Sequence, residues 1–378
     1  MARETLIPSE RDLDTIDIDV NVGPQHPATH GVFRMVLTID GEVVRDLDPV
    51  IGYMHRGNEK LPENCDFRQV IGYHDRIDYL AQFNTEHCYV EAVEKLGGIV
   101  PTERSQYIRV ILAELNRITS HLMFIGAFGT DAGLFGTSFM YAFRDREYVQ
   151  EFYEEITGER MMYNYFRPGG VAWDVPENFK ERCRQILDRI RKGIGDLEGL
   201  MVGNEVIMAR CKGLSPMTPA QAINWGLSGP LLRATGLAHD IRRAEPYSIY
   251  DRFEFDIPVG TTGDVYDRLM VRMLELSQSV RIIEQALDQM PEGPIMAAGM
   301  KRILRVPAGE VYMRVESPRG EYGVYMVSTG VDKPYRHKVR GASFCNISAL
   351  REMSVGHFVA DVIMILGSTD IVLCEVDR

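Results

Sequence analysis

Residues 102–126 read TERSQYIRVILAELNRITSHLMFIG, and this stretch decides the fold of the chain. Its apolar residues recur every three to four positions: Ile108, Ile111, Leu112, Leu115, Ile118, Leu122 and Ile125. This spacing is typical of an amphipathic helix that buries one face. Thr102 follows Pro101 and suits the cap position before the first turn. The pattern therefore predicts a long helix over 102–126.

Two more stretches carry the same helical period. Residues 176–205 begin with a proline suited to a first helical turn, and residues 262–289 repeat the apolar stripe. The chain from about 60 to 290 therefore reads as largely helical, and three helices of this length predict a bundle.

The flanking segments read as strands. Residues 14–52 alternate apolar and polar side chains around an Asp40-Gly41 turn, and residues 309–330 read as a hairpin across Pro318-Arg319-Gly320. A last helix is expected near 348–366. The predicted class is α+β. We expect an N-terminal sheet region over 1–58, a helical bundle over 59–300, and a hairpin with a C-terminal helix and buried terminus over 301–378.

Composition excludes several classes of function. Forty-two basic against 54 acidic residues give a net charge of −12, which argues against a nucleic-acid-binding protein. No apolar stretch is long enough for a membrane span. The six cysteines contain no CxxC pair, which argues for reduced thiols and against a cysteine-held cluster within this chain.

The segment GPQHPATHG, residues 23–31, holds His26 and His30 between prolines and glycines. Such residues favour a loop of fixed shape. Histidine exchanges protons near neutral pH and also binds metals, so the loop is a candidate proton donor or metal site. The alternative is a pair of capping or surface histidines.

Three further segments group polar residues. YMHRGNEK (53–60) carries Arg56, and YHDRIDY (73–79) carries Arg76 and Tyr79 three positions apart on one helical face. Their simpler interpretations are a solvated turn and a polar contact between helices. GAFGTDAG (126–133) carries Asp131, which could orient a histidine, although a glycine-rich helix end is common.

Taken in order, these motifs resemble the 49 kDa-type, or D-type, subunit family of NADH-quinone oxidoreductase, which is respiratory complex I. GPQHPATHG, GYMHRGNEK, DRIDY, ELNRITSHL, RPGGV, the Tyr322–Tyr325 hairpin segment and DIVLCEVDR all fall in register. The resemblance extends from about residue 18 to Arg378. It implies a fold similar to that of the nickel–iron hydrogenase large subunit, which is related to this family.

The hydrogenase relation allows a test of the metal hypothesis. Hydrogenase large subunits bind nickel and iron through two cysteine pairs. Aligning the motifs places Asp78, Ala81, Val372 and Glu375 at the four cysteine positions. Such a metal site requires soft thiolates, so hydrogenase activity is excluded and no metal site is expected.

The resemblance also implies roles for single residues. His30 and Tyr79 match the pair that hydrogen-bonds the two quinone carbonyls, and Asp131 matches the carboxylate that holds His30. Arg56 and Arg76 match arginines beside a terminal 4Fe-4S cluster of the neighbouring subunit. The family often has a histidine, linked to proton-coupled behaviour of that cluster, at the position of Met162, which cannot titrate.

The implied function is that of a peripheral subunit of proton-pumping NADH:quinone oxidoreductase, on the cytoplasmic side of the bacterial membrane. It would form the quinone-reduction site and bind no redox cofactor alone. The implied partners are the cluster-bearing small subunit (B-type), the C-type and I-type subunits, and the H-type membrane subunit. The alternatives are a related complex fed by another donor such as ferredoxin, and a scaffold that no longer binds quinone.

Overall fold

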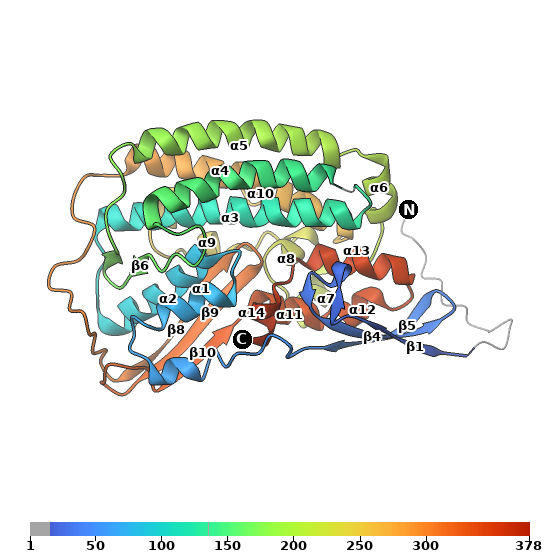
Figure 1. The fold of residues 1–378 in the computed structure, drawn as a ribbon, viewed down its shortest axis with the longest axis horizontal. Helices are drawn as coiled ribbons and strands as arrows, with labels where there is room; N and C mark the ends of the chain where they lie inside the picture. Colours follow the sequence, from blue (N-terminus) through green and yellow to red (C-terminus); the bar gives the residue numbers. More distant parts are fainter. Residues whose placement is uncertain (1–15, 135) are drawn as a thin grey trace.

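A layer of long helices dominates the computed structural model, which describes residues 16–134 and 136–378. Its members are α3 (Glu103–Asp131), α4 (Thr137–Thr157), α5 (Phe179–Met201) and α10 (Val265–Gln289), which run side by side in Figure 1. The helix predicted over 102–126 is confirmed, but it continues to Asp131. The glycine-rich segment 126–133 therefore contains the end of this helix, as expected, but the helix ends five residues later than predicted.

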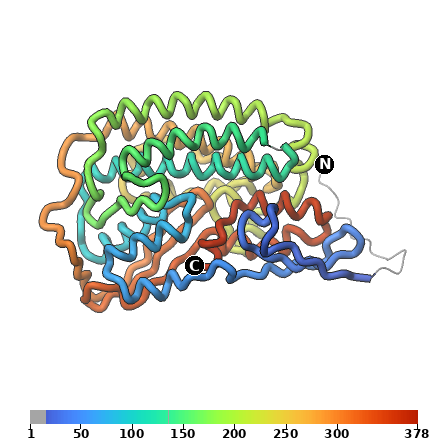
Figure 2. The backbone as a smooth tube through the Cα atoms, viewed as in Figure 1, coloured from blue at the N-terminus to red at the C-terminus, as the bar shows by residue number. Residues whose placement is uncertain are grey.

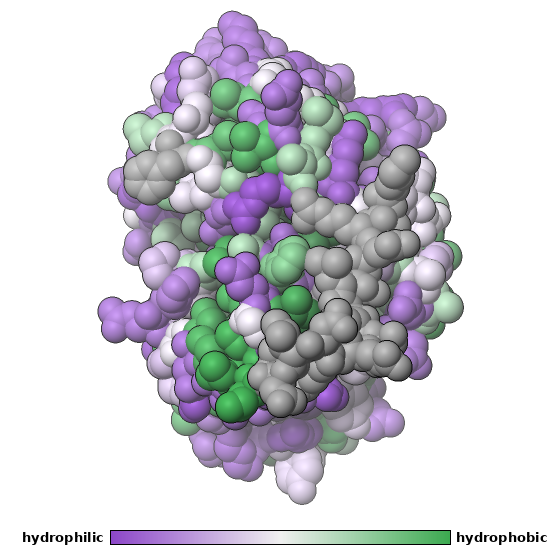
Figure 3. Space-filling view, turned by 90° about the vertical axis from the view of Figure 1, so that its right-hand side faces the viewer, coloured by the Kyte–Doolittle hydropathy of each residue, from purple (hydrophilic) through white to green (hydrophobic). Residues whose placement is uncertain are grey.

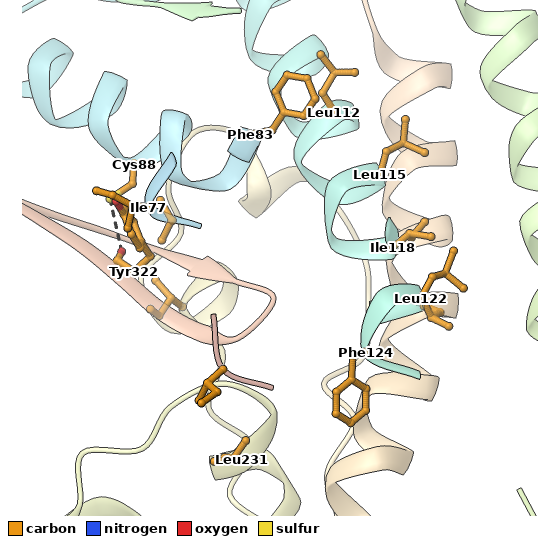
Figure 4. Packing of buried hydrophobic residues seen from close by; sticks show 14 of the residues in the cluster. Ile77, Phe83, Cys88, Leu112, Leu115, Ile118, Leu122, Phe124, Leu231 and Tyr322 are labelled. Atoms are coloured by element: carbon orange, nitrogen blue, oxygen red, sulfur yellow. Dashed lines mark hydrogen bonds between the residues drawn. The ribbon is translucent and has the colours of Figure 1, made fainter. Parts of the chain in front are cut away.

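The apolar stripes face the interior as predicted. On α5 the buried residues include Cys183, Ile186, Ile190 and Leu197, while the opposite face is exposed. Helix α3 is buried on nearly all sides. Figure 4 shows Leu115, Ile118 and Leu122 along the side of α3 that faces α10.

The second predicted helix, 176–205, is shorter than expected. It begins at Phe179 and ends at Met201, and a separate helix α6 (Glu205–Cys211) follows. Gly203 between them has φ of 77°, a left-handed conformation that interrupts a helix. The side chain of Asn204 then caps α6 by accepting the N–H groups of Val206 and Ile207.

The predicted N-terminal antiparallel sheet is confirmed over the described residues. Strands β1 (Ile18–Val22), β4 (Arg34–Asp40) and β5 (Val43–Val50) pair in the order β1-β4-β5. The His26/His30 loop joins β1 to β4 and contains the short β2 (Gln25–His26) and β3 (Gly31–Val32). The first 15 residues of the expected 1–58 region lie outside the described residues.

A second antiparallel sheet contains the predicted hairpin. Strands β8 (Gly309–Ser317) and β9 (Gly320–Ser328) pair so that Val311 lies opposite Met326, and β10 (Arg336–Arg340) adds to β9. Helices α1 (Ile71–Ile77) and α2 (Gln82–Gly97) lie between this sheet and the long helices (Figure 1). The Cys88 thiol of α2 contacts the Tyr322 carbonyl at 3.5 Å (Figure 4).

The single helix expected near 348–366 is wrong. The segment contains the end of α11 (Ala342–Ser348), then α12 (Leu350–Ser354) and α13 (Val359–Thr369). Gly356 adopts φ of 85° and turns the chain between α12 and α13. A buried final helix, α14 (Leu373–Asp377), follows. In Figure 2 the red C-terminal segments lie beside the blue N-terminal ones.

The remaining short elements connect these layers: η1 (Pro27–Thr29), η2 (Leu61–Asn64), β6 (Phe166–Arg167), β7 (Gly170–Val171), α7 (Pro219–Asn224), α8 (Pro230–Ala234), α9 (Ile241–Ala244) and η3 (Tyr250–Arg252).

None of the described helices is long and apolar enough to cross a membrane. Figure 3 views the end of the molecule that carries α6 and α13, where hydrophobic side chains gather among hydrophilic ones.

Candidate functional site

The two loop histidines have different environments. His26 caps the short η1 turn, and its Nδ1 accepts the N–H of Ala28 at 3.3 Å. His30 follows the same turn in a left-handed conformation, with φ of 53°. This turn directs the His30 ring toward the end of α3. His26 therefore shapes the loop, and His30 reaches the interior.

His30 is paired with the last residue of α3. Its Nε2 lies 2.5 Å from Oδ2 of Asp131, and both side chains are largely buried. Burial alone would lower the pKa of His30. The hydrogen bond and charge of Asp131, together with the charge of Asp370, outweigh burial and raise the pKa of His30 above its usual value. The pair therefore favours a protonated imidazole.

Tyr79 lies just after α1 and faces the same cavity as His30. Burial raises the pKa of the Tyr79 phenol, and the charges of Asp78 and Asp370 add to this effect. The hydroxyl has no hydrogen-bond partner within residues 16–134 and 136–378. Tyr79 is therefore a neutral phenol whose proton can be donated to a bound ligand.

The cavity between His30 and Tyr79 has a volume of about 290 Å³. Its polar lining consists of His30, Tyr79, Thr130, Asp131 and Asp370. The apolar lining consists of Pro27, Leu80, Met123, Phe124, Ala127, Phe139, Ile371 and Val372. An apolar wall with a few polar groups is typical of a site for a small organic ligand.

A chain of buried charges lies beneath this cavity. Nη1 of Arg319 donates to both Asp78 oxygens at 3.1 and 2.9 Å, and its Nη2 lies 3.4 Å from Asp370. Arg272 stands 3.7 Å from Asp370 and 4.1 Å over the Phe124 ring. Asp370 thus belongs both to the cavity lining and to an ion-paired floor.

Asp78 and Glu375, which the predicted hydrogenase relation matches to metal-binding cysteines, are bonded to other protein groups. Asp78 is ion-paired to Arg319, and Glu375 accepts the N–H groups of Ala342 and Ser343 at 2.8 and 3.1 Å. Burial and the nearby Asp78 charge raise the pKa of Glu375 to about 7. Among the described residues, no group of three or more His, Cys, Asp or Glu side chains is arranged to hold a metal ion.

Arg56 and Arg76 come together in a second hollow, which has a volume of about 460 Å³. Asn58, Leu61, Gln69, Gly72 and Tyr73 complete its lining. Close by, the Asp377 carboxylate accepts the N–H groups of Gly52 and Met54 at 2.8 and 2.6 Å. The buried α14 helix therefore holds the segment that carries Arg56. Two guanidinium groups in one hollow favour a negatively charged neighbour.

Sequence reasoning misses three residues that shape the cavity. Arg319 appears in the sequence only as a turn residue, and Arg272 only as part of a helical pattern. Gly367 of α13 lies against the pair: a Cβ added there would be 2.9 Å from Asp131 Oδ2 and 3.9 Å from His30 Nε2. No sequence signal marks this glycine, because its neighbours come from residues 30 and 131.

Comparisons with known proteins find relatives along almost the whole chain. Residues 131–305 and 298–378 match the family model described as respiratory-chain NADH dehydrogenase, 49 Kd subunit. The chain is 51% identical over 365 residues to the D-type subunit of NADH-quinone oxidoreductase from Carboxydothermus hydrogenoformans, covering 97% of this chain and 100% of the relative. It is 52% identical to the protein of the same name from Dehalococcoides mccartyi strain 195, with 95% and 98% covered.

Proposed function

The chain belongs to the 49 kDa subunit family of NADH-quinone oxidoreductase, or respiratory complex I, and from this premise we propose that its buried cavity is where quinone is reduced. Membership makes the chain a component of an oxidoreductase complex, with other complex I subunits as its partners. The observation that carries the proposal is the placement of His30 and Tyr79 in the lining of one apolar cavity.

The proposed chemistry follows from the two donors. Reduction of a quinone to a quinol takes up two electrons and two protons. The Tyr79 phenol and the His30 imidazolium both line the cavity, so each can protonate one carbonyl oxygen. When His30 loses its proton, the Asp131 carboxylate is left without its cationic partner. The reaction thus leaves an unbalanced negative charge at the end of α3.

We further propose that the electrons come from a 4Fe-4S cluster of a neighbouring subunit that docks against the Arg56/Arg76 hollow. Two guanidinium groups there would favour the reduced state of such a cluster and raise its potential. The partners would be the B-type, C-type, I-type and H-type subunits, with the complex on the cytoplasmic side of the membrane. The relatives' names favour NADH over ferredoxin as the first electron donor.

The decisive variant is Tyr79→Phe in the assembled complex. Loss of the phenol proton should lower quinone reductase activity about 100-fold or more, whereas ferricyanide reduction by upstream centres persists. Tyr335→Phe is the matched control, because Tyr335 is 69% exposed and lies outside the cavity lining. Near-normal quinone turnover in Tyr79→Phe would overturn the assignment.

The arginine hollow has its own test. Arg76→Met removes one positive charge and should lower the midpoint potential of the neighbouring cluster, measured by EPR-monitored redox titration. Arg68→Met is a suitable control, because it also removes one positive charge. Arg68 lies only seven positions after the lining residue Leu61 but does not itself line the hollow. An unchanged potential and EPR signal in Arg76→Met would place the cluster elsewhere.

A further inference from the structure

Two buried carboxyl groups face each other on neighbouring helices, away from the cavity lining. Asp75 of α1 and Glu86 of α2 are both fully buried, and their side chains lie within hydrogen-bonding range of each other. Oδ1 of Asp75 receives no hydrogen bond from an N–H or hydroxyl group in the described part of the chain. A proton carried by Glu86 would satisfy this oxygen, because a protonated carboxyl group is a donor.

The other oxygens of the pair bind one loop. Asp75 Oδ2 accepts the N–H of Asn164 at 3.0 Å. Glu86 Oε2 accepts the N–H groups of Tyr165 and Phe166 at 3.1 and 2.8 Å. The backbone N–H groups of three successive residues between α4 and β7 therefore donate hydrogen bonds to this carboxyl pair.

The bound loop has a conformation that needs such support. Met162 and Asn164 adopt left-handed φ angles of 64° and 43°, which are unfavourable for residues with side chains. Between them, the Tyr163 ring stacks on Phe83 at 4.3 Å between centroids. The carboxyl pair and this stacking contact hold residues 162–166 against α1 and α2.

Electrostatics favour one proton on the pair. Burial is the main cause that raises the pKa values of both groups, and the Asp75 charge raises the pKa of Glu86 further. Neither carboxyl forms an ion pair with a described residue. Two carboxylates in contact at a dry site cannot both ionise readily.

Charged and titratable groups surround the site from each packed element. Arg76 follows on α1, and Arg167 belongs to β6; both lower the pKa of Asp75. Tyr163 faces the pair from the loop. The groups one layer further out are His87 with Glu91 on α2, Arg109 of α3 over the Phe166 ring, Arg146 of α4 facing Tyr163, and Arg68 near Arg167.

A second carboxylate on α2 binds a loop in a different way, with a cationic partner. Glu94 also accepts a loop N–H, that of Gly169, at 2.7 Å, but it is paired with Arg109 at 2.7 Å. Glu94 therefore holds its loop while it is bonded to a cationic side chain. Asp75 and Glu86 hold theirs without a bonded cation, so they need a proton instead.

We propose that Asp75 and Glu86 form a proton-binding site that keeps one shared proton at neutral pH and thereby clamps residues 162–166 to α1 and α2. Its proton affinity depends on the charge in the Arg56/Arg76 hollow, because Arg76 is adjacent to Asp75. A negative charge entering that hollow offsets Arg76 and strengthens proton binding. The site is distinct from the quinone cavity, and its existence does not depend on quinone reduction.

Hydrogen exchange on the full chain in its complex tests the clamp, with residue-resolved mass spectrometry across neutral and alkaline pH. Protection is corrected for intrinsic exchange rates. At Asn164, Tyr165 and Phe166 it should fall about tenfold per pH unit above the pH at which half of the Asp75/Glu86 pairs have lost the shared proton, because ionisation of the pair opens the loop. Protection at Gly169, held by the Glu94–Arg109 pair, should not follow this course. Equal pH dependence at Gly169, or none at 164–166, would overturn the proposal.

Variants of the two carboxyl groups test whether the shared proton, rather than the fold itself, causes the pH dependence. In Glu86→Gln the amide donates to Asp75 at every pH, so the pH-dependent loss of hydrogen-exchange protection at residues 164–166 should vanish. The infrared band of a protonated carboxyl group should vanish as well. Asp75→Asn should do the same from the opposite side if Glu86→Gln does not fold. Arg76→Gln should move the midpoint to higher pH. A retained step in both carboxyl variants contradicts the proton site, and an unmoved midpoint contradicts its link to the hollow.

Discussion

Helix α3 joins two regions that differ in how many hydrogen-bond donors surround a buried carboxylate. Near its middle, Glu114 accepts hydrogen bonds from Arg117, Arg242, Tyr250 and Ser279. At its end, His30 is the one described side chain that bonds the Asp131 carboxylate. A carboxylate saturated with donors stabilises one structure. A carboxylate with a single titratable partner beside a cavity can respond to a ligand.

The saturated region extends well beyond Glu114. It forms an ionic core, by which we mean Glu114, Arg117, His121, Arg233, Asp240, Arg242, Glu275 and Glu316. These residues link α3, α8, α9, α10 and β8. The attraction of Arg117 and Arg242 overcomes burial and lowers the pKa of Glu114 to about 2. Each member is bonded to at least one other, so the core acts as one unit.

The largest expected effect is that of breaking this core. Glu114→Ala leaves two guanidinium groups and a phenol buried without their acceptor, and should lower the free energy of unfolding by about 3–5 kcal/mol. Denaturant titration of the purified chain measures the change.

Glu254→Ala is the control for this loss. The Glu254 side chain is 86% exposed and lies 3.8 Å from Arg281, so its removal should change the free energy of unfolding by less than about 0.5 kcal/mol. Similar losses in the two variants would show that the ionic core contributes no more than a surface contact.

The sequence predicts these two regions unequally well. The apolar stripe of α3 identifies the helix and its buried face. The same periodic analysis treats Glu114 and Arg117 as ordinary polar positions, because their partners Arg242 and Tyr250 are more than a hundred residues away. Buried charge networks depend on tertiary neighbours, which a local pattern does not contain.

The cavity residues show a similar limit. The two histidines and the tyrosine stand out by residue type. The residues alone suggest that Asp131 could orient a histidine, but only the resemblance to a family implies that this histidine is His30. Arg319 has no local signal, since the turn it occupies is normally exposed and is here buried between Asp78 and Asp370. The interrupted C-terminal helix escapes prediction for another reason: the apolar spacing continues across Gly356, although the backbone does not.

A smaller effect is expected where α13 packs on the His30–Asp131 pair. Gly367→Ala places a Cβ 2.9 Å from Asp131 Oδ2, closer than carbon and oxygen tolerate. The carboxylate must move, which should cost about 1–3 kcal/mol of stability and reduce quinone turnover through the displaced His30. Thermal unfolding and quinone reductase assays measure the two consequences.

Gly199→Ala supplies the matched control in the helix layer. Gly199 lies within α5, and an added Cβ there meets nothing within 4 Å. Alanine should therefore stabilise the helix by about 0.5–1 kcal/mol and leave turnover unchanged. If Gly367→Ala had the same stability and quinone turnover as Gly199→Ala, the tight packing around Asp131 would not be needed for function.

The smallest effect distinguishes the two regions by the sign of their pH dependence. Glu114 has a folded pKa of about 2 against an ordinary 4.5, so its contribution to stability is present above pH 4.5 and is lost as the pH falls toward about 2. His30 has a raised pKa, so its contribution is full below its ordinary value of 6.5 and is lost as the pH rises through the folded pKa. The stability difference between the wild-type chain and His30→Gln should therefore shrink as denaturant titrations move from about pH 6 to about pH 9. A difference that grows over this range would mean that Asp131 holds a neutral imidazole, and His30 could not then be the proton donor proposed for the cavity.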